Sequence, residues 1–380
     1  MKRSTIGACA LMFLLAFSSC NTAKVEVVDF PYKLDSITID APYLSAYANG
    51  FIQADDDLIF YGYNHWQHTI EKINITKRRL DGFIELEKEG PKGIQWFGKF
   101  MIYQDQLVAT NFHEYVSTDL HFSNISRFRC DVIEAKNCMY AEDGQLFSNG
   151  TEGVHAANYR WLDCSESGKT IYAPVYQTGK TKASLNYKLP IGYKLNLADG
   201  EFQLLNATYP KDLQEQSVEY LGLSRAQFVE LEADRLLYNF PYCSKIFIYD
   251  AVTGETQEYK GTHLDEPVYV DPLRGAKNDV PVRERMEYEM KSQRFGRVFY
   301  HAALDCYSRI EYEKENDDLF HQRYNLDILD KDLKVIKRYK LPFQFAECYP
   351  YDKGLFFNIR NAENDDTQFF FVQSDFSQLL

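Results

Sequence analysis

Residues 55–86 read DDDLIFYGYNHWQHTIEKINITKRRLDGFIEL, and this stretch decides the fold. It contains a short acidic turn, an aromatic-rich segment and two further segments in which apolar residues recur at about every second position. Such spacing places alternate side chains on one face of a strand. The stretch therefore predicts a turn followed by three antiparallel strands.

The same pattern returns at residues 228–259, which read FVELEADRLLYNFPYCSKIFIYDAVTGETQEY. Weaker copies begin at four other places, near Met101, Arg160, Arg297 and Pro350. Residues 139–150 would supply part of a further unit. A sheet unit that repeats in this way is typical of a propeller blade. We therefore expect an all-β fold over residues 36–380, a β-propeller of six or seven blades. A single sandwich is the alternative, but it would be oversized for this number of strands.

One of two N-terminal segments, residues 25–30 or residues 36–39, is expected to close the ring as a strand of the last blade, near residues 369–372. Two other segments, 211–225 and 280–293, have helical composition and interrupt the strand pattern. We expect them to be short helical insertions. Mixed charge favours solvated helices on the rim, and contact with a partner or a pocket is the alternative.

Composition favours strands and argues against a nucleic-acid-binding protein. The chain holds 28 Tyr and 27 Phe, and aromatic residues are enriched in strands. Its 42 Lys and Arg stand against 55 Asp and Glu, a formal net charge of −13. Nucleic-acid-binding proteins concentrate positive charge to replace the counterions of phosphate, so we expect no nucleic-acid partner.

The first residues have the features of a secretory signal. Lys2 and Arg3 precede an apolar run at 6–17, and two serines precede Cys20. The run is too short to cross a bilayer, and the small-small-Cys ending resembles the lipobox of bacterial lipoproteins, in which the cysteine carries the lipid. We therefore expect a signal peptide at 1–19. An ordinary signal peptide with an incidental cysteine is the alternative.

Lipidation at Cys20 predicts an outer-membrane lipoprotein that faces the periplasm or the cell surface, with residues 20–35 as its lipidated N-terminus and tether. The membrane would then be a partner through the N-terminal lipid. Loss of Lys2 and Arg3 leaves 40 − 55 = −15 for the mature chain. An acidic body is held off anionic headgroups, so the lipid must provide the attachment.

Six cysteines remain after Cys9 and Cys20 are set aside, and they are Cys130, Cys138, Cys164, Cys243, Cys306 and Cys348. Six cysteines allow 15 pairings, and sequence alone does not choose among them. Burial as small apolar side chains is the alternative to disulfides.

The lipobox, the stretch IELEKEGPKGI at 84–94 and the aromatic turn–strand repeats together resemble an uncharacterised family of Bacteroidetes lipoproteins, a domain of unknown function with a TolB-like β-propeller fold. In that family a Glu-Gly-Pro-x-Gly turn ends an early blade and leads into the next. The matching turn here is residues 89–93. The resemblance implies a fold and a cellular address, and it implies no reaction and no catalytic residues.

No motif for a nucleophile, a phosphate-binding loop or a dinucleotide-binding loop occurs in the chain, so no cofactor is expected. His65 and His68 stand three apart, but a strand or turn aims such residues to opposite sides, which disfavours a shared metal. The acidic turns at 55–57 and 364–366 lack the ordered spacing of a calcium loop. We expect solvated turns there and no metal site.

Aromatic side chains offer a route to ligand binding, because sugars and peptides stack on Tyr and Trp. The candidate ligand-binding residues are Trp66, Trp96, Trp161, Tyr242 and, as a partner for an anion, Arg160. Core packing between blades is the alternative for each aromatic ring.

We therefore expect a non-catalytic role in the cell envelope, either binding or scaffolding, with an envelope protein or a glycan as ligand. The first alternative is a glycan-active hydrolase or lyase that uses carboxylates in the propeller's central pocket. A sensor or accessory partner of a membrane transporter is a third. The sequence assigns no catalytic residue.

Overall fold

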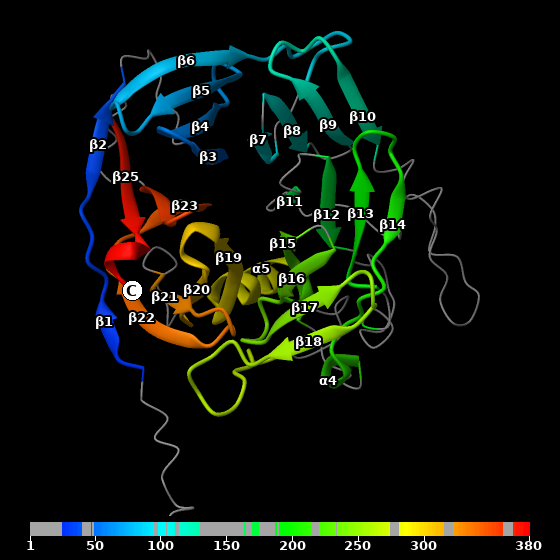
Figure 1. The fold of residues 1–380 in the computed structure, drawn as a ribbon, viewed down its shortest axis with the longest axis vertical. Helices are drawn as coiled ribbons and strands as arrows, with labels where there is room; N and C mark the ends of the chain where they lie inside the picture. The colour runs from blue at the N-terminus through cyan, green and yellow to red at the C-terminus, as the bar shows by residue number, and fades with distance from the viewer. Residues whose placement is uncertain are drawn as a thin grey trace, which may run out of the picture.

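The fold is a six-bladed β-propeller, a ring of six antiparallel sheets around one axis (Figure 1). In this computed structural model, the described residues are 25–39, 47, 49–94, 98–103, 105–110, 114–129, 163–164, 169–174, 187, 190–214, 220–232, 234–273, 281–314, 322–359 and 368–380. The prediction of a β-propeller is confirmed, with six blades. The additional unit at 139–150 lies outside the described residues.

Each blade runs from an innermost strand at the axis to an outermost strand at the rim (Figure 1). From the axis outward, blade 1 holds β3 (Gly50–Ala54), β4 (Leu58–Asn64), β5 (Thr69–Asn74) and β6 (Arg79–Glu85), and blade 2 holds β7 (Phe100–Tyr103), β8 (Gln106–Thr110), β9 (Glu114–Asp119) and β10 (Ile125–Arg129). Blade 3 holds β11 (Asp163–Cys164), β12 (Thr170–Pro174), β13 (Gly192–Asn196) and β14 (Phe202–Leu204), and blade 4 holds β15 (Gln227–Glu232), β16 (Arg235–Asn239), β17 (Ile246–Asp250) and β18 (Thr256–Tyr259). Blade 5 holds β19 (Arg294–His301), β20 (Cys306–Tyr312), β21 (Tyr324–Leu329) and β22 (Val335–Leu341), and blade 6 holds β23 (Phe345–Tyr351), β24 (Gly354–Ile359) and β25 (Gln368–Asp375).

The N-terminal part of the chain closes the ring, as predicted. Strand β2 (Asp35–Thr38) is the outermost strand of blade 6 and pairs antiparallel with β25. Strand β1 (Val27–Asp29) pairs parallel with β22 and adds a fifth strand to blade 5. Within the predicted tether at 20–35, backbone pairing with β22 places Val27–Asp29 in the sheet of blade 5.

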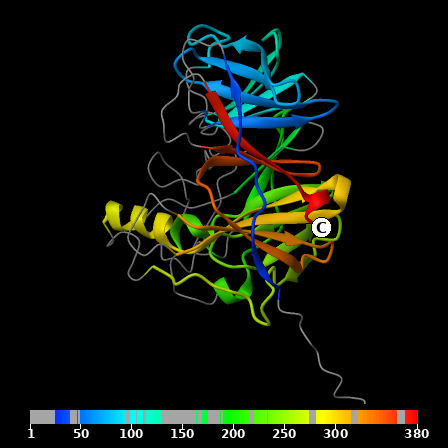
Figure 2. The same cartoon turned by 90° about the vertical axis from the view of Figure 1, so that its left-hand side faces the viewer.

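Alternation of strand direction gives the ring two different faces. The face on which each outermost strand passes to the next innermost strand is called the connector face, and the opposite face is called the hairpin face. The helical insertions are confirmed and lie in connectors: α4 (Lys211–Gln214) and η1 (Leu221–Ser224) precede blade 4, and α5 (Val282–Lys291) precedes blade 5. Figure 2 shows α5 projecting from this face. Two further 3-10 turns are η2 (Ala302–Leu304) and η3 (Phe376–Gln378).

The Glu-Gly-Pro-Lys-Gly segment forms a turn between blades 1 and 2, as expected. The N–H of Gly93 donates to the carbonyl of Gly90 at 3.0 Å, and the N–H of Ile94 donates to the carbonyl of Glu87 at 2.8 Å. Gly90 has a φ of 88°, in the left-handed region that favours glycine. No helix in the described part of the chain is long and apolar enough to span a membrane.

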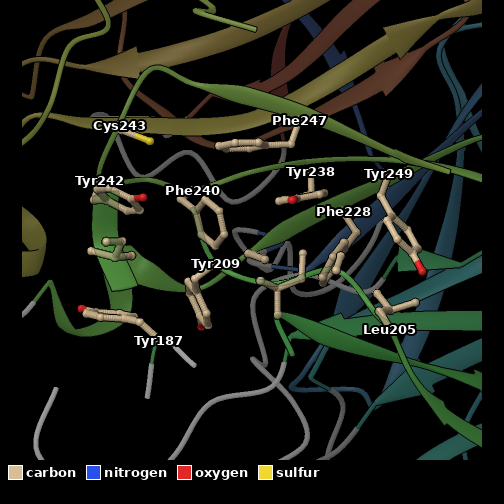
Figure 3. Close-up of a cluster of buried hydrophobic side chains, with 14 of the residues drawn as sticks. Tyr187, Leu205, Tyr209, Phe228, Tyr238, Phe240, Tyr242, Cys243, Phe247 and Tyr249 are labelled. Carbon is tan, nitrogen blue, oxygen red and sulfur yellow. The ribbon is translucent and has the colours of Figure 1, made fainter. Parts of the chain in front are cut away.

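Cores lie between neighbouring blades, where flat rings fill the space between two pleated surfaces. The cluster between blades 3 and 4 is largely aromatic (Figure 3). In it the rings of Tyr238 and Phe247 stack at 5.0 Å, and those of Tyr209 and Phe240 stack at 5.4 Å. Each such pair contributes about 0.5–1.5 kcal/mol beyond the area it buries. This packing accounts for much of the aromatic content.

A buried asparagine joins blades 4 and 5 at a β-bulge. The ladder of β19 and β20 shifts register between Phe295 and Val298. The side chain of Asn239 donates to the carbonyl of Gly296 at 2.9 Å and accepts from the N–H of Val298 at 3.3 Å. Asn239 is fully buried, so it satisfies two backbone groups that the bulge removes from the ladder.

Replacement of this asparagine is expected to destabilise the ring. The variant Asn239→Ala leaves the two buried backbone groups without that partner, so we expect the free energy of unfolding to fall by about 2–3 kcal/mol in urea denaturation. Asn124→Ala is the control, because Asn124 lies on an exposed turn, and we expect a change below about 0.5 kcal/mol. Equal effects of the two substitutions would contradict the role of Asn239.

Candidate functional site

An ion pair spans blade 1 near the connector end of the axis. Lys99 immediately precedes β7 of blade 2, and Glu347 is the third residue of β23 in blade 6. The Lys99 Nζ lies 2.5 Å from the Glu347 Oε2, and the two side chains are 13% and 18% exposed. The first strand of blade 1, β3, lies between β23 and β7 (Figure 1). The pair therefore joins two blades that are not neighbours.

A second cation, Arg297, acts on β23, the strand that carries Glu347. Arg297 is on β19, the innermost strand of blade 5, and burial lowers the pKa of its guanidinium to about 10. Burial raises the pKa of the Cys348 thiol, and Glu347 acts in the same direction, whereas the charges of Lys99 and Arg297 oppose it. Arg297, Lys99 and Glu347 thus all act electrostatically on Cys348, the residue that follows Glu347 on β23.

A third cation and a phenol complete the group. The guanidinium of Arg294, the first residue of β19, lies 4.0 Å from the centroid of the Tyr312 ring. Arg294 also donates to the carbonyl of Met290 at 2.7 Å, near the C-terminus of α5. Burial raises the pKa of Tyr312, and Cys348 and Glu347 add to this effect. Arg294 thus connects helix α5 to the axis.

We call Lys99, Arg294, Arg297, Tyr312 and Glu347 the axial cluster. Its charged members are three cations and one carboxylate, although the chain as a whole carries −13. A charge in a partly buried site interacts more strongly than one in water, because the effective dielectric constant is lower. The arrangement is suited to hold an anionic group, and a carboxylate would pair with Arg or Lys in charge-assisted hydrogen bonds.

The aromatic residues predicted to bind ligand fall in different environments. Trp66 is 71% exposed, lies on the β4–β5 turn of the connector face, and its ring is 4.8 Å from that of His65. Tyr242 is 1% exposed and belongs to the core between blades 3 and 4 (Figure 3). Its ring stacks on Tyr220 at 4.6 Å. The expectation of an exposed ring at Tyr242 is corrected to core packing, the alternative stated for it.

The other three candidates, Trp96, Trp161 and Arg160, lie outside the described residues. The structure therefore does not bring the five candidates together. Trp66 stands at the turn between the two middle strands of blade 1. The axial cluster lies on or directly before innermost strands, except for Tyr312 on β20, the strand next to β19. Trp66 and the axial cluster share a face but not a site.

The two histidines of blade 1 have different roles. His65 is exposed, and His68 is 3% exposed in a left-handed conformation with a φ of 59°. The Nδ1 of His68 is 2.8 Å from the Tyr63 hydroxyl. Burial lowers the pKa of His68, which favours its neutral form. Within the described ranges, no group of three or more His, Cys, Asp or Glu side chains is placed to hold a metal ion.

The described cysteines and acidic turns have structural explanations. Cys243, Cys306 and Cys348 are buried and carry free thiols. Cys130 and Cys138 lie outside the described residues. Asp105 and Asp305 occupy left-handed positions, with φ values of 65° and 46°, in the inner hairpin turns. Aspartate tolerates this conformation better than most residues, so its presence there follows from turn geometry.

Among the described residues, each carboxyl group with a displaced pKa has that pKa lowered. Backbone N–H groups of a turn lower the pKa of Asp119 and of Asp250. Ion pairs and side-chain hydrogen bonds do the same for Asp35, Asp57 and Asp81. A general acid needs the opposite displacement, so these five groups are not candidates for one.

The axial cluster was missed by sequence reasoning. Lys99 and Glu347 are 248 residues apart, and neither belongs to a spacing motif. One signal was available, because each residue lies at or just before the start of an innermost strand. Charged residues at those positions converge on the axis once the number and order of blades are known.

The architecture and the axial cluster define the class: a β-propeller with a polar, cationic group at the connector end of its axis. The model of a domain of unknown function, DUF4221, matches residues 26–338. The chain belongs to this family.

The chain is similar in fold to a DUF4221 protein from Bacteroides vulgatus, at 14% identity and a TM-score of 0.67, with 93% of this chain and 98% of that chain covered. A protein from Bacteroides fragilis, named only provisionally as an exported protein, gives 11% identity and a TM-score of 0.48, with 92% and 98% covered. At these identities the likeness to the first concerns the fold alone, and the second carries no argument. No curated protein matches the chain.

Proposed function

We propose that the protein is a lipid-anchored binding protein of the cell envelope, and that it holds a ligand by a carboxylate at the axial cluster without catalysing a reaction. The observation that carries the proposal is the excess of positive charge there, three cations against Glu347. An acidic glycan or the C-terminal carboxylate of a peptide has the required chemistry. The exposed ring of Trp66, on the same face, is available to a ligand that extends away from the axis.

Several observations favour binding over catalysis. The displaced carboxyl pKa values in the described residues are lowered, and the two described histidines with the deepest burial, His68 and His301, are engaged in hydrogen bonds. A lipid on Cys20 and a position at the outer membrane, facing the periplasm or the surface, are the other parts of the proposal and rest on the lipobox.

Binding is tested with a panel of acidic and neutral oligosaccharides and peptides. We expect that the compounds that raise the melting temperature carry a carboxylate, and that Lys99→Met raises their Kd about tenfold, the loss of one charge-assisted hydrogen bond. Lys340→Met is the control, because Lys340 is exposed on β22 at the rim. The double variant Lys99→Met with Glu347→Gln separates ligand binding from the cost of leaving Glu347 unpaired. Preference for neutral compounds, or equal binding by Lys99→Met, would refute the proposal.

A further inference from the structure

We infer that the edge of the ring formed by β1, β22 and the β1–β2 link rests on the lipid surface when the protein is anchored. We call this edge the N-terminal rim and define its apolar part by the exposed side chains Val27, Val28, Tyr32, Leu34, Ile336 and Leu380. The inference rests on the proposed lipid anchor. It adds which part of the propeller meets the membrane.

Exposed apolar side chains gather on this rim. In the described residues, twelve large apolar side chains are exposed, and six of them are the residues of the N-terminal rim. Tyr32 and Leu34 are 47% and 49% exposed, and the Tyr32 ring lies 5.0 Å from that of Phe343. Among the described strands, β1 is the last of its sheet and has a neighbour on one side only. Exposed apolar side chains concentrated along one edge in this way indicate an interaction surface.

The length of the tether indicates that the bilayer is what contacts this surface. Six residues lie between Cys20 and Val27, which β1 fixes to β22, so seven Cα–Cα steps join the two. Even a fully extended chain of that length reaches only roughly 25 Å. A compact domain of this size is roughly 50 Å across. The lipid therefore holds the propeller close to the bilayer on the side where β1 begins, and Figure 2 shows β1 and β2 together along this edge.

The charges of the rim suit a headgroup region. Exposed charged residues directly before β1, on β1, on the link and on β22 are Lys33 and Lys340 against Glu26 and Asp29, a balance of zero. Lys337 is half-buried and donates to the carbonyl of Leu379. Asp35 is engaged by Arg78 at 2.7 Å. The rim thus escapes the repulsion expected for the acidic body as a whole, and lysines beside apolar side chains are typical of surfaces that lie in the membrane interface.

The orientation has a consequence for the proposed binding site. The rim is on the circumference of the ring, whereas the innermost strands that carry most of the axial cluster surround the axis (Figure 1). With the rim on the lipid, the axis lies along the membrane plane. The connector face then remains open to ligands from the side.

The test compares added tryptophans in the anchored protein. Leu34→Trp places a fluorophore on the rim, and Val252→Trp places one on the exposed β17–β18 turn of blade 4, where Val252 is 76% exposed. The native tryptophans give the same background in both variants. Vesicles contain phosphatidylethanolamine and phosphatidylglycerol, with plain or brominated acyl chains. We expect brominated lipid to quench about half of the added Leu34→Trp emission and to leave that of Val252→Trp unchanged, because bromine quenches only rings at the acyl boundary.

Two further measurements distinguish a failure of the proposed lipid anchor from a failure of the rim inference. Trypsin cleavage after Lys24 releases residues 20–24, and their mass shows whether Cys20 carries lipid. If it does not, the anchoring part of the proposed function fails. The rim is still tested, by attaching the same variants through an N-terminal polyhistidine to nickel-chelating lipid in the same vesicles. Equal quenching of both variants would overturn the inference, as would a dimer in solution that shields Leu34→Trp.

Discussion

The variant Asp327→Asn is expected to lose about 3–5 kcal/mol of unfolding free energy, because it removes the counter-charge of a buried network. The side chains of Asp327 and Arg309 are fully buried, with Arg309 Nη2 3.7 Å from Asp327 Oδ2. Arg338 donates to Asp327 at 2.6 and 2.9 Å and also pairs with Glu311 at 2.6 Å. Without the Asp327 charge, two arginines share the one carboxylate of Glu311.

The network also fixes the connector face. Arg309 donates to the carbonyls of Ser244, at 2.6 Å, and of Gly261, both in blade 4, so a cation of blade 5 holds the loops next to the aromatic core. Burial lowers the pKa of Arg309, which shows how strongly this position disfavours a charge without compensation. Loss of Asp327 is therefore expected to loosen the contact between the two blades.

Urea denaturation measures the change, with an exposed ion pair as control. Arg283 and Glu287 pair at 2.9 Å on α5 with side chains 90% and 39% exposed, so Glu287→Gln is expected to cost less than about 0.5 kcal/mol. The double variant Arg309→Met with Asp327→Asn removes both charges. We expect it to recover about half of the unfolding free energy that Asp327→Asn loses, and a double-mutant cycle measures this coupling. A loss below about 1 kcal/mol in Asp327→Asn would show that the network does not stabilise the ring.

Local patterns were sufficient to predict the blades. The turn-and-strand unit at 55–86 became β4, β5 and β6, and the unit at 228–259 became blade 4. Both depend on alternation of apolar residues and on turn residues, which act within a few positions. The innermost strand β3 was missed, since its five residues carry little alternation of their own.

Ile70 and Ile73 stand three apart on β5, and both are fully buried although this odd spacing places them on opposite faces of the strand. Ile70 packs in a cluster with residues of blade 2, whereas Ile73 packs in a cluster with residues of blade 6. A strand with a blade on each side buries both of its faces, so alternation alone does not predict which residues are buried.

Contacts between blades could not be predicted from the sequence. Arg309 and Ser244 are 65 residues apart, and Lys99 and Glu347 are 248 residues apart. Such pairs are set by blade order and by the tilt of each sheet. The same reason explains Tyr242: its position after a strand is compatible with an exposed ring or with a core, and the neighbouring blade decides.

Acid is expected to weaken the ring through one histidine between blades 5 and 6. His301 is fully buried, its Nδ1 lies 2.9 Å from the carbonyl of Tyr351, and its Nε2 lies 2.8 Å from the Ser308 hydroxyl. The carbonyl can only accept, so Nδ1 carries the proton and Nε2 accepts from Ser308. The ring also packs edge-on against Phe376 at 4.8 Å. Burial lowers the pKa of His301 to about 4, and the hydrogen bond to Tyr351 opposes this only in part.

The direction of the effect follows from proton binding. An unfolded histidine has a pKa near 6.5, so between about pH 6.5 and pH 4 the unfolded chain binds a proton that the folded chain does not. Stability from neutral His301 is complete above this range and falls as the pH is lowered through it. A difference of about 2.5 pKa units corresponds to a loss of about 3 kcal/mol by pH 4.

The variant His301→Gln separates this loss from other acid effects. Its amide retains a donor for Tyr351 and an acceptor for Ser308, but it does not titrate. Burial also lowers the pKa of His68 and of His263, and those groups remain in both proteins. We therefore expect the difference in unfolding free energy between wild type and His301→Gln to shift by about 3 kcal/mol, in favour of the variant, from pH 7 to pH 4. A constant difference across this range would mean that His301 is protonated in the folded ring, and that the joint between blades 5 and 6 tolerates a buried imidazolium.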